Sequence, residues 1–408
     1  MSRRILLHVG TPKTGTSYLQ DVLFGNRERL LEQGVLYPAD RFDEHFLAAL
    51  DLMRLRWGGL EREAVGAWDR LAQRVREHDG TSIISHEILA TATRAQIDRA
   101  LASLGHEADG GGAEVHLVIS VRDLVRQIPA EWQENVKHRA EFGYAKFLDI
   151  IRDPDRSHRV GGWFWGVQEI PDILDRWGAA LPPERVHLVT VPRPGSPRDL
   201  LWQRFSATFG LDDLDLDLGT ERANISLGVP ESALVRRINK EAATDLPAAH
   251  YRPRVRARRA HRTLSQRTAS ARLSLPPDAY PWVADLTERW IAELEKRAYD
   301  VVGDLADLRG EAPSPEKWAD PDHPDEGAVA AAAVDALRAL LVEAGARFDE
   351  SESLRRRIAE LEGELVEARK PMRLRAAERT VQRLEASRGG RRALAAYRSA
   401  RGRSSRLA

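Results

Sequence analysis

The chain has 408 residues, of which 62 are basic and 62 acidic, so its formal net charge is zero. This balance gives the protein no overall attraction to nucleic acid or to an anionic membrane, and we expect neither as a partner. Cysteine is absent, which excludes disulfides and thiolate metal ligands and suits a reducing compartment. No window approaches the roughly twenty apolar residues of a membrane helix, so we expect a cytoplasmic protein without a membrane span.

The first element along the chain is a short apolar run, Ile5–Val9, which is followed by a loop that ends at Gly15. A short apolar run bounded by glycine is typical of a buried strand, and a helical pattern begins at Thr16. Strand, glycine loop and helix in this order form an anion site. The backbone N–H groups of the loop and of the helix N-terminus point at one place.

The loop differs from the Walker A loop of nucleoside-triphosphate enzymes in the position of its lysine. Three positions of the pattern G-x-x-x-x-G-K-[ST] match, namely Gly10, Gly15 and Ser17. The lysine position holds Thr16, and a lysine occurs three residues earlier, at Lys13. Because only seven of the 62 basic residues are lysine, we interpret Lys13 as part of the anion site.

Three further strands are predicted downstream, with helical sequence between them: Ser82–Glu87, Val115–Val121 and Val186–Val191. Strands separated by helices predict an α/β fold, a parallel sheet with helices on both faces. Ligands of such sheets bind beyond the carboxyl ends of the strands, where Lys13, Glu87 and Arg122 fall. We predict a loop at Gly34–Pro38 and a helix over Trp282–Val301.

Composition divides the chain into four parts: an α/β domain over 1–310, a proline- and acid-rich linker over 311–327, a helical segment over 328–370 and a basic flexible tail over 371–408. The tail carries eleven arginines and two glutamates. Alternating four- and three-residue steps in the helical segment join Leu354, Ile358, Leu361 and Leu365. They predict a short coiled coil of about two heptads and weak self-association.

The sequence P-K-T-G-T-[ST] after a first strand, here Pro12–Ser17, resembles the 5′-phosphosulfate loop of the PAPS-dependent sulfotransferases of bacterial type, which have a P-loop-like fold. PAPS is 3′-phosphoadenosine 5′-phosphosulfate. The resemblance implies that this co-substrate's 5′-phosphate is held by Thr14, Gly15, Thr16 and Ser17, with Lys13 near the bridging oxygen. No metal is expected, because a lysine and amides suffice for a sulfuryl group where phosphoryl transfer usually requires Mg²⁺.

Arg122 ends the third predicted strand, where the family has an arginine that binds the 3′-phosphate with a serine eight residues later. In this chain that later position is Ala130, and the family's R-K-G loop is missing. Gln133 or Lys137 could compensate for the serine, or both could face solvent. The R-K-G loop could be replaced by residues 222–226 or by the arginines of 252–272.

Sulfuryl transfer requires a base that removes the acceptor proton. The resemblance implies a histidine or glutamate on a strand beside the loop, and we favour Glu87, with His86 second and His45 third. Neighbouring strand residues point to opposite faces, so only one of His86 and Glu87 can face the donor. In a purely structural alternative, Glu87 caps the following helix or pairs with an arginine.

Three aromatics lie between glycines at Trp163–Trp165, and they either line an acceptor cleft or pack in the core, which we expect for at least two of them. The resemblance implies an enzyme that moves a sulfuryl group from PAPS to a hydroxyl or amine of a carbohydrate or small metabolite. One alternative is a P-loop kinase or NTPase. Another is a non-catalytic interaction protein with the sulfotransferase fold.

Overall fold

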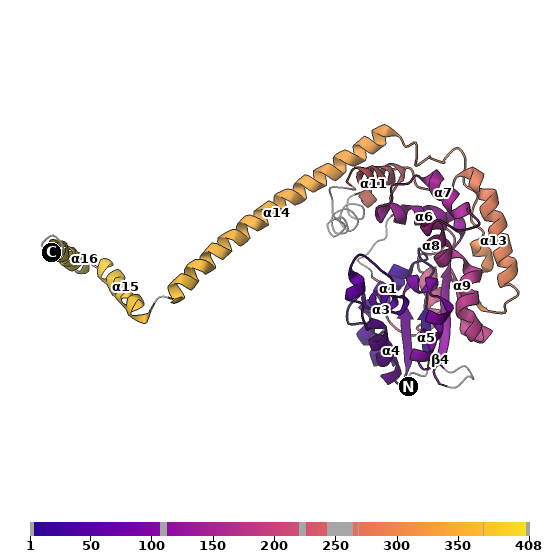
Figure 1. The fold of residues 1–408 in the computed structure, drawn as a ribbon, viewed down its shortest axis with the longest axis horizontal. Coiled ribbons are helices and arrows are strands. Elements are labelled where there is room, and N and C mark those ends of the chain that lie inside the picture. The colour runs from indigo at the N-terminus through magenta and orange to yellow at the C-terminus, as the bar shows by residue number, and fades with distance from the viewer. Residues whose placement is uncertain are drawn as a thin grey trace. The chain divides into compact units, whose positions relative to one another are not determined.

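The computed structural model describes residues 4–106, 112–219, 226–242, 264–267, 269–369 and 371–404. It divides into two units, Met1–Ala336, which contains the sheet, and Leu337–Ala408, which is helical where described (Figure 1). Two candidate substitutes for the R-K-G loop, 222–225 and most of the arginine run, lie outside the described residues.

The first unit is an α/β structure around one parallel sheet, as the sequence predicted. In the part of the chain described here the sheet has six strands, in the order β2-β3-β1-β4-β5-β6. They are β1 (Arg4–His8), β2 (Val35–Leu36), β3 (Thr81–Ser85), β4 (Glu114–Val121), β5 (Val186–Thr190) and β6 (Asp300–Val302). Every pair of neighbours is parallel.

Two edge strands correct the sequence prediction. The expected loop at Gly34–Pro38 contains β2, and the expected helix over Trp282–Val301 ends earlier, as α13 (Tyr280–Leu294), and is followed by β6. Strands of two and three residues show no alternation of polar and apolar positions that a sequence pattern could detect. The strand expected over Ser82–Glu87 is also shorter, because β3 ends at Ser85.

Alternate residues of the central strands face two separate apolar layers. Ile5 and Leu7 of β1 belong to the larger cluster, whereas Leu6 belongs to the smaller one. The larger cluster includes residues of α3 (Glu44–Met53), α4 (Ala67–Glu77), α5 (Arg94–Ser103), α6 (Leu124–Lys137), α7 (Tyr144–Arg152), α8 (Arg159–Gln168), α9 (Ile170–Trp177), α11 (Val229–Glu241) and α13. The smaller includes α1 (Thr16–Gly25), α2 (Arg27–Glu32) and α10 (Leu200–Phe209). Helices therefore cover both faces of the sheet.

The strand order reverses direction beside β1. The chain leaves β1 towards β2 and β3 on one side and then crosses to β4 on the other. Pairing continues just past the strand ends, where Thr11 N donates to Ser120 O at 2.8 Å and His86 N donates to His8 O at 3.0 Å. In open parallel sheets, ligands bind outside the carboxyl ends at such a reversal.

Part of the segment expected as a linker packs on the first unit. Asp322 accepts hydrogen bonds from the backbone N–H groups of Tyr144 and Ala145, both at 2.9 Å, at the start of α7. It also pairs with Arg236 at 2.6 Å. Val329 and Ala332, in the next helix, are buried. The compact unit therefore continues past residue 310, where we placed the domain boundary.

The remaining helices are α14 (Glu326–Arg369), α15 (Met372–Glu385) and α16 (Arg388–Ser404), the last two within the segment expected as a flexible tail. Short 3₁₀ turns occur at Leu60–Arg62, Glu87–Thr91, Gly178–Ala180, Pro183–Arg185, Leu264–Gln266, Pro277–Ala279 and Leu305–Leu308. None of the helices in the described ranges is long and apolar enough to cross a membrane.

Candidate functional site

The loop between β1 and α1 lies directly against Glu87. Gly10 has a φ of 121°, and a Cβ added there would lie 2.9 Å from the Glu87 carbonyl oxygen. Lys13 and Gly15 also have positive φ, 64° and 93°. Glycine tolerates this conformation, but for lysine it costs energy that the surrounding structure must supply. The loop therefore holds Lys13 in one particular backbone position.

Hydrogen bonds from side-chain hydroxyl groups stabilise this loop. The Thr14 hydroxyl donates to the Thr11 carbonyl oxygen at 2.6 Å and lies 2.5 Å from the Ser120 hydroxyl. Thr11 in turn donates to the Ser120 carbonyl oxygen at 3.1 Å. Because the Thr14 side chain is buried in these contacts, Thr14 can meet an anion only through its backbone N–H.

The first turn of α1 supplies the remaining predicted anion donors. Gly15 precedes the helix, and its carbonyl oxygen accepts from Leu19 N at 3.0 Å. The backbone N–H groups of Thr16 and Ser17 come before that first helical bond, as helix-terminal N–H groups do, and so they have no acceptor within the helix. The structure thus places both residues at the positive end of the helix dipole.

His8, at the end of β1, lies beneath the loop and was not singled out from the sequence. Its two ring nitrogens lie 2.8 Å from the Ser85 hydroxyl and 3.0 Å from the Ser120 hydroxyl. Burial lowers the pKa of His8 to about 4, although Glu87 opposes this shift. His8 is therefore neutral at pH 7 and connects β1, β3 and β4 without adding charge.

Arg122 reaches the loop from the end of β4, as the sequence predicted for strand ends. Its Nη1 donates to the Lys13 carbonyl oxygen at 3.0 Å and lies 3.4 Å from Gln127 Oε1. Its Nε is buried and has no hydrogen-bond partner among the described residues. Burial lowers the pKa of Arg122 to about 10, with a smaller effect from Arg126, so the guanidinium stays charged at neutral pH.

Lys13 forms an ion pair that the sequence did not reveal. Its Nζ lies 2.6 Å from Glu134 Oε2, and this carboxylate also lies 3.1 Å from His138 Nε2 and 4.0 Å from Lys137 Nζ. Burial alone would raise the pKa of Glu134. Lys13, His138 and Lys137 together hold it well below its ordinary value. Glu134 is therefore an ionised carboxylate surrounded by three basic side chains.

The two residues proposed to replace the missing serine do not face solvent. Gln133 is buried and bonds the backbone of Leu227 in both directions, at 2.8 and 3.0 Å. Its amide therefore ties α6 to the segment before α11. Lys137 is also buried, near Glu134, so it remains within reach of the loop's lysine.

Glu87 lies two residues after the end of β3 and opens a 3₁₀ turn. Its Oε2 accepts from Gln20 Nε2 at 3.0 Å and lies 4.0 Å from His86 Nδ1. Burial raises the pKa of Glu87, but His86, the Glu87 N–H, Gln20 and Lys13 outweigh burial and lower it below the ordinary value. Glu87 is thus ionised at neutral pH.

His86 caps the same turn. Its Nδ1 accepts from Ile88 N at 3.2 Å, so the neutral ring, by this assignment, carries its proton on Nε2. Burial lowers the pKa of His86, and Glu87 only partly opposes that shift. A neutral imidazole whose lone pair already accepts a backbone N–H has no free site for a proton. The Nδ1 lone pair of His86 is therefore occupied, whereas Glu87 is an ionised carboxylate.

His45, the third candidate, is a buried residue of α3. Its Nδ1 accepts from Ser85 N at 3.2 Å, and its ring lies 4.4 Å from that of Tyr37. Burial lowers the pKa of His45 to about 3, with a smaller contribution from His86. His45 therefore packs in the core.

Glu131, on α6, is a second carboxyl that the sequence analysis passed over. It is buried, and its Oε1 accepts from Gln168 Nε2 at 3.1 Å. Gln168 accepts from Gln127, which donates to the Pro12 carbonyl oxygen at 2.7 Å. Burial raises the pKa of Glu131 to about 7, with Lys13 opposing the shift and Glu134 adding to it. The spacing of Glu131 and Glu134, three residues apart on a helix, was the available sequence signal.

A row of aromatic rings runs from His86 to α8. Phe46 stacks on His86 at 5.1 Å and contacts Trp57, which lies 5.8 Å from Trp163 and 6.1 Å from His138. Trp163 lines a hollow of about 370 Å³ together with Met53, Leu55, Thr91, Thr93, Gln96, Arg159, Gly162 and Gly166. Phe164 and Trp165 are buried, which confirms that two of the three aromatics at 163–165 belong to the core.

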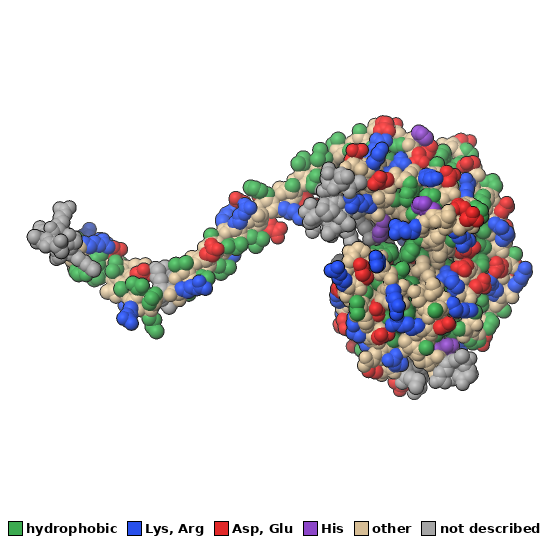
Figure 2. Space-filling view, in the orientation of Figure 1, with side chains coloured by type: hydrophobic (Ala, Val, Ile, Leu, Met, Phe, Trp, Pro, Cys, Tyr) green, Lys and Arg blue, Asp and Glu red, His purple; other side chains and the backbone are tan. Residues whose placement is uncertain are grey.

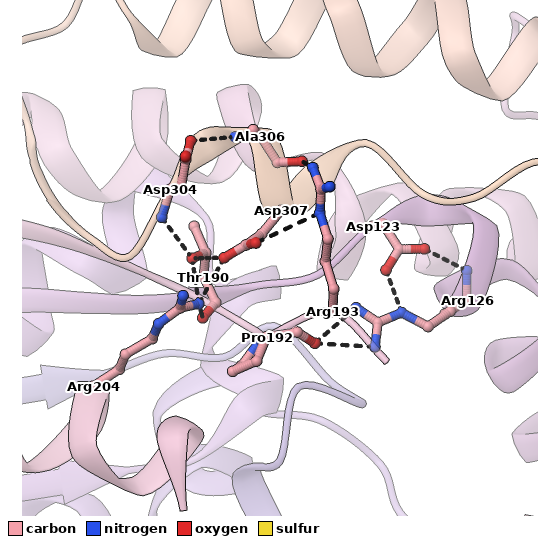
Figure 3. Close-up of polar contacts among 9 residues, drawn as sticks. All are labelled: Asp123, Arg126, Thr190, Pro192, Arg193, Arg204, Asp304, Ala306 and Asp307. Carbon is pink, nitrogen blue, oxygen red and sulfur yellow. Dashed lines mark hydrogen bonds and ion pairs between the residues drawn. The ribbon is translucent and has the colours of Figure 1, made fainter. Parts of the chain in front are cut away.

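A separate polar cluster lies at the carboxyl end of β5 (Figure 3). Thr190 donates to Asp307 Oδ2 at 2.8 Å, and Arg204 Nη1 bonds the Thr190 carbonyl and hydroxyl and the same Asp307 oxygen at 2.6–2.8 Å. Asp304 N donates to the Thr190 hydroxyl at 3.2 Å. Arg193 lies 3.7 Å from the other Asp307 oxygen and donates to a backbone carbonyl.

Among the described residues, no three His, Asp or Glu side chains are grouped so that they could hold a metal ion. The chain matches no known protein-family model, no curated protein and no solved structure.

Proposed function

We propose that this protein is a PAPS-dependent sulfotransferase that transfers a sulfuryl group to a hydroxyl or amine. One observation carries the proposal: Lys13, Arg122 and Glu87 converge on one glycine loop at the reversal of strand order. Arg122 bonds the Lys13 carbonyl oxygen, and Glu87 lies against Gly10 of the same loop. A cation, a buried guanidinium and an ionised carboxylate at one anion site suit transfer of an anionic group to a neutral acceptor.

In this proposal the loop and the start of α1 bind the 5′-phosphosulfate. The N–H groups of Gly15, Thr16 and Ser17 surround the 5′-phosphate, and Lys13 neutralises charge on the bridging oxygen. Lys13 exchanges Glu134 for the donor, because both are anions that compete for one ammonium group. The buried Nε of Arg122, which has no partner among the described residues, is the donor that we assign to the 3′-phosphate.

Glu87 serves as the base. It accepts the acceptor's proton while the acceptor oxygen or nitrogen forms a bond to sulfur and the bond from sulfur to the bridging oxygen breaks. The electron pair of that bond stays on the leaving 5′-phosphate oxygen beside Lys13, which yields 3′-phosphoadenosine 5′-phosphate. Gln20 donates to Glu87 Oε2 and so holds the carboxylate in place.

The aromatic row is the proposed acceptor surface. It begins beside Glu87, at His86 and Phe46, and continues through Trp57 to Trp163. Flat apolar rings next to polar groups suit the face of a sugar ring or an aromatic metabolite. Either acceptor class supplies the hydroxyl that the proposed reaction requires.

Calorimetric titration with 3′-phosphoadenosine 5′-phosphate, with and without Mg²⁺, tests the proposal. We expect binding that does not depend on the metal, and Lys13→Ala should weaken this binding by a smaller factor than it lowers turnover. Binding of ATP only with Mg²⁺ would instead support a P-loop kinase or NTPase. Absence of binding for every adenine nucleotide tried would support a non-catalytic interaction protein.

A further inference from the structure

Helix α14 carries an apolar face that the other described residues of its own unit, Leu337–Ala408, leave exposed. It is one continuous helix of 44 residues, about 66 Å long at 1.5 Å per residue. Its early residues Val329 and Ala332 are buried, but from Leu337 onward large apolar side chains are exposed. Figure 2 shows these side chains along the helix between charged ones. A long helix gains most of its stability from a packed apolar face, so an exposed one indicates a missing partner.

The exposed face follows a heptad repeat. This repeat is longer than the two heptads that were predicted from Leu354 to Leu365. Steps of three and four residues connect nine consecutive seam positions, and seven of them are apolar, the exceptions being Arg347 and Ser351. The nine positions are Leu337, Leu340, Ala344, Arg347, Ser351, Leu354, Ile358, Leu361 and Leu365. Four heptads in one frame on one unbroken helix meet the requirement for a coiled coil.

The middle of the seam has the fewest large apolar residues. Apolar residues directly beside the seam add apolar surface there. Leu341 and Phe348 flank the seam on one side and are both 64% exposed. They widen the apolar stripe where Ala344 and Arg347 narrow it. The stripe therefore stays continuous from Leu337 to Leu365.

The charges beside the seam match those of an identical helix laid parallel and in register. In such a pair, the residue directly before every second seam position, starting from Leu337, faces the residue five places later on the other helix. This rule gives five pairs, and three of them join two charged residues: Glu350 with Arg355 of the second copy, Arg357 with Glu362, and Glu364 with Arg369. All three pairs join opposite charges, and the two-fold symmetry repeats each of them.

We propose that α14 pairs with α14 of a second copy of this chain as a parallel two-stranded coiled coil. The self-complementary charges identify the second copy as the partner, because an unrelated helix would not be expected to match all three pairs. This inference does not depend on the proposed activity.

Light scattering after size exclusion measures the association. We expect the full chain at about 50 µM to have twice its monomer mass of 45.7 kDa. The double variant Leu361→Glu, Leu365→Glu should raise the dimer dissociation constant by roughly 100-fold or more, since it buries carboxylates in the seam. Both leucines are exposed in a single chain, so folding of the first unit should not change. The control Val366→Glu changes an exposed neighbour outside the seam and should leave the dimer intact.

The relative orientation of the two helices is tested by introducing one cysteine. The chain has no cysteine of its own that could form a competing disulfide. Leu337→Cys should form a disulfide-linked dimer under mild oxidation, because parallel pairing places the two copies of residue 337 side by side. The charge exchange Glu350→Arg with Arg355→Glu should keep the dimer, whereas Glu350→Arg alone should weaken it. A monomeric full chain, or equal effects of Leu365→Glu and Val366→Glu, would overturn the proposal. So would a dimer in which Leu337→Cys fails to cross-link.

Discussion

Two polar clusters lie at the carboxyl edge of the same sheet, and they differ in how completely their charges are satisfied. In the cluster at the end of β5, Asp307 accepts hydrogen bonds from Thr190 and Arg204 and lies close to Arg193. The Thr190 hydroxyl also accepts a hydrogen bond from a backbone N–H. Figure 3 shows Arg193 and Arg204 turned towards the Asp307 carboxylate. Each group there has its counterpart within the protein, so the cluster fastens the segment after β6 to β5.

The cluster around the loop at the end of β1 is organised differently. Arg122 leaves its buried Nε without a partner among the described residues, and Lys13 has positive φ. Glu131 has a pKa raised to about 7, with Glu134 ionised one turn away. The comparison teaches that position at the carboxyl edge is insufficient to define a site. Incomplete satisfaction of buried charge, with strained backbone, distinguishes the proposed binding cluster from the cluster at the end of β5.

The largest expected effect is on turnover, in the loop cluster. Glu87→Gln keeps shape and one hydrogen bond but removes basicity, so turnover with an identified acceptor should fall by roughly 10²–10⁴-fold. Donor affinity should be nearly unchanged. Because the pKa of Glu87 is lowered, wild-type activity should disappear on acidification only below the ordinary glutamate range. Full activity of Glu87→Gln together with an inactive His86→Asn would reverse the assignment.

In the β5 cluster we expect a loss of stability in place of a loss of activity. Asp307→Ala leaves the largely buried Arg204 without its carboxylate and should lower the free energy of unfolding by about 3 kcal/mol. Lys13→Met removes an ion pair that is partly exposed to solvent, which should cost about 1 kcal/mol or less. Urea unfolding of both variants measures the contrast. Equal losses would show that the two clusters do not differ as described.

Glu131 gives a pH-dependent version of the same contrast. Its pKa is raised from 4.5 to about 7 in the folded chain, so the protonated form stabilises the fold. That contribution is complete below pH 4.5 and is lost as the pH rises to about 7. The unfolding free energy of wild type should therefore fall by roughly 3 kcal/mol relative to Glu131→Gln over this interval. Parallel pH profiles of the two proteins would contradict a raised pKa.

The last expected effect concerns the 3′-phosphate. Arg122→Ala should weaken binding of 3′-phosphoadenosine 5′-phosphate by about 1.5–3 kcal/mol, the value of a hydrogen bond to a charged group. Affinity for adenosine 5′-phosphate, which lacks the 3′-phosphate, should change much less in the same titration. If both ligands lose affinity equally, Arg122 supports the loop through the Lys13 carbonyl and does not read the 3′-phosphate.

The sequence by itself determined the α/β class, the four longer strands and the loop with Lys13, because each depends on local pattern. A buried strand such as β4 is a continuous apolar run, and a glycine loop before a helix is visible without any tertiary contact. The same reasoning placed Glu87 and Arg122 at strand ends. The preference for Glu87 over His86 came from the resemblance, and the backbone N–H that His86 accepts could not be read from the sequence.

Only the tertiary structure decided which side chains share the loop's environment. Glu134 and Glu131 are more than a hundred residues from Lys13, and the crossing of the chain from β1 to β4 brings α6 beside the loop. Edge strands β2 and β6 likewise exist through pairing with β3 and β5, since two or three residues have too little pattern of their own. Burial, charge pairing and strand pairing act between distant segments, and local sequence carries no record of them.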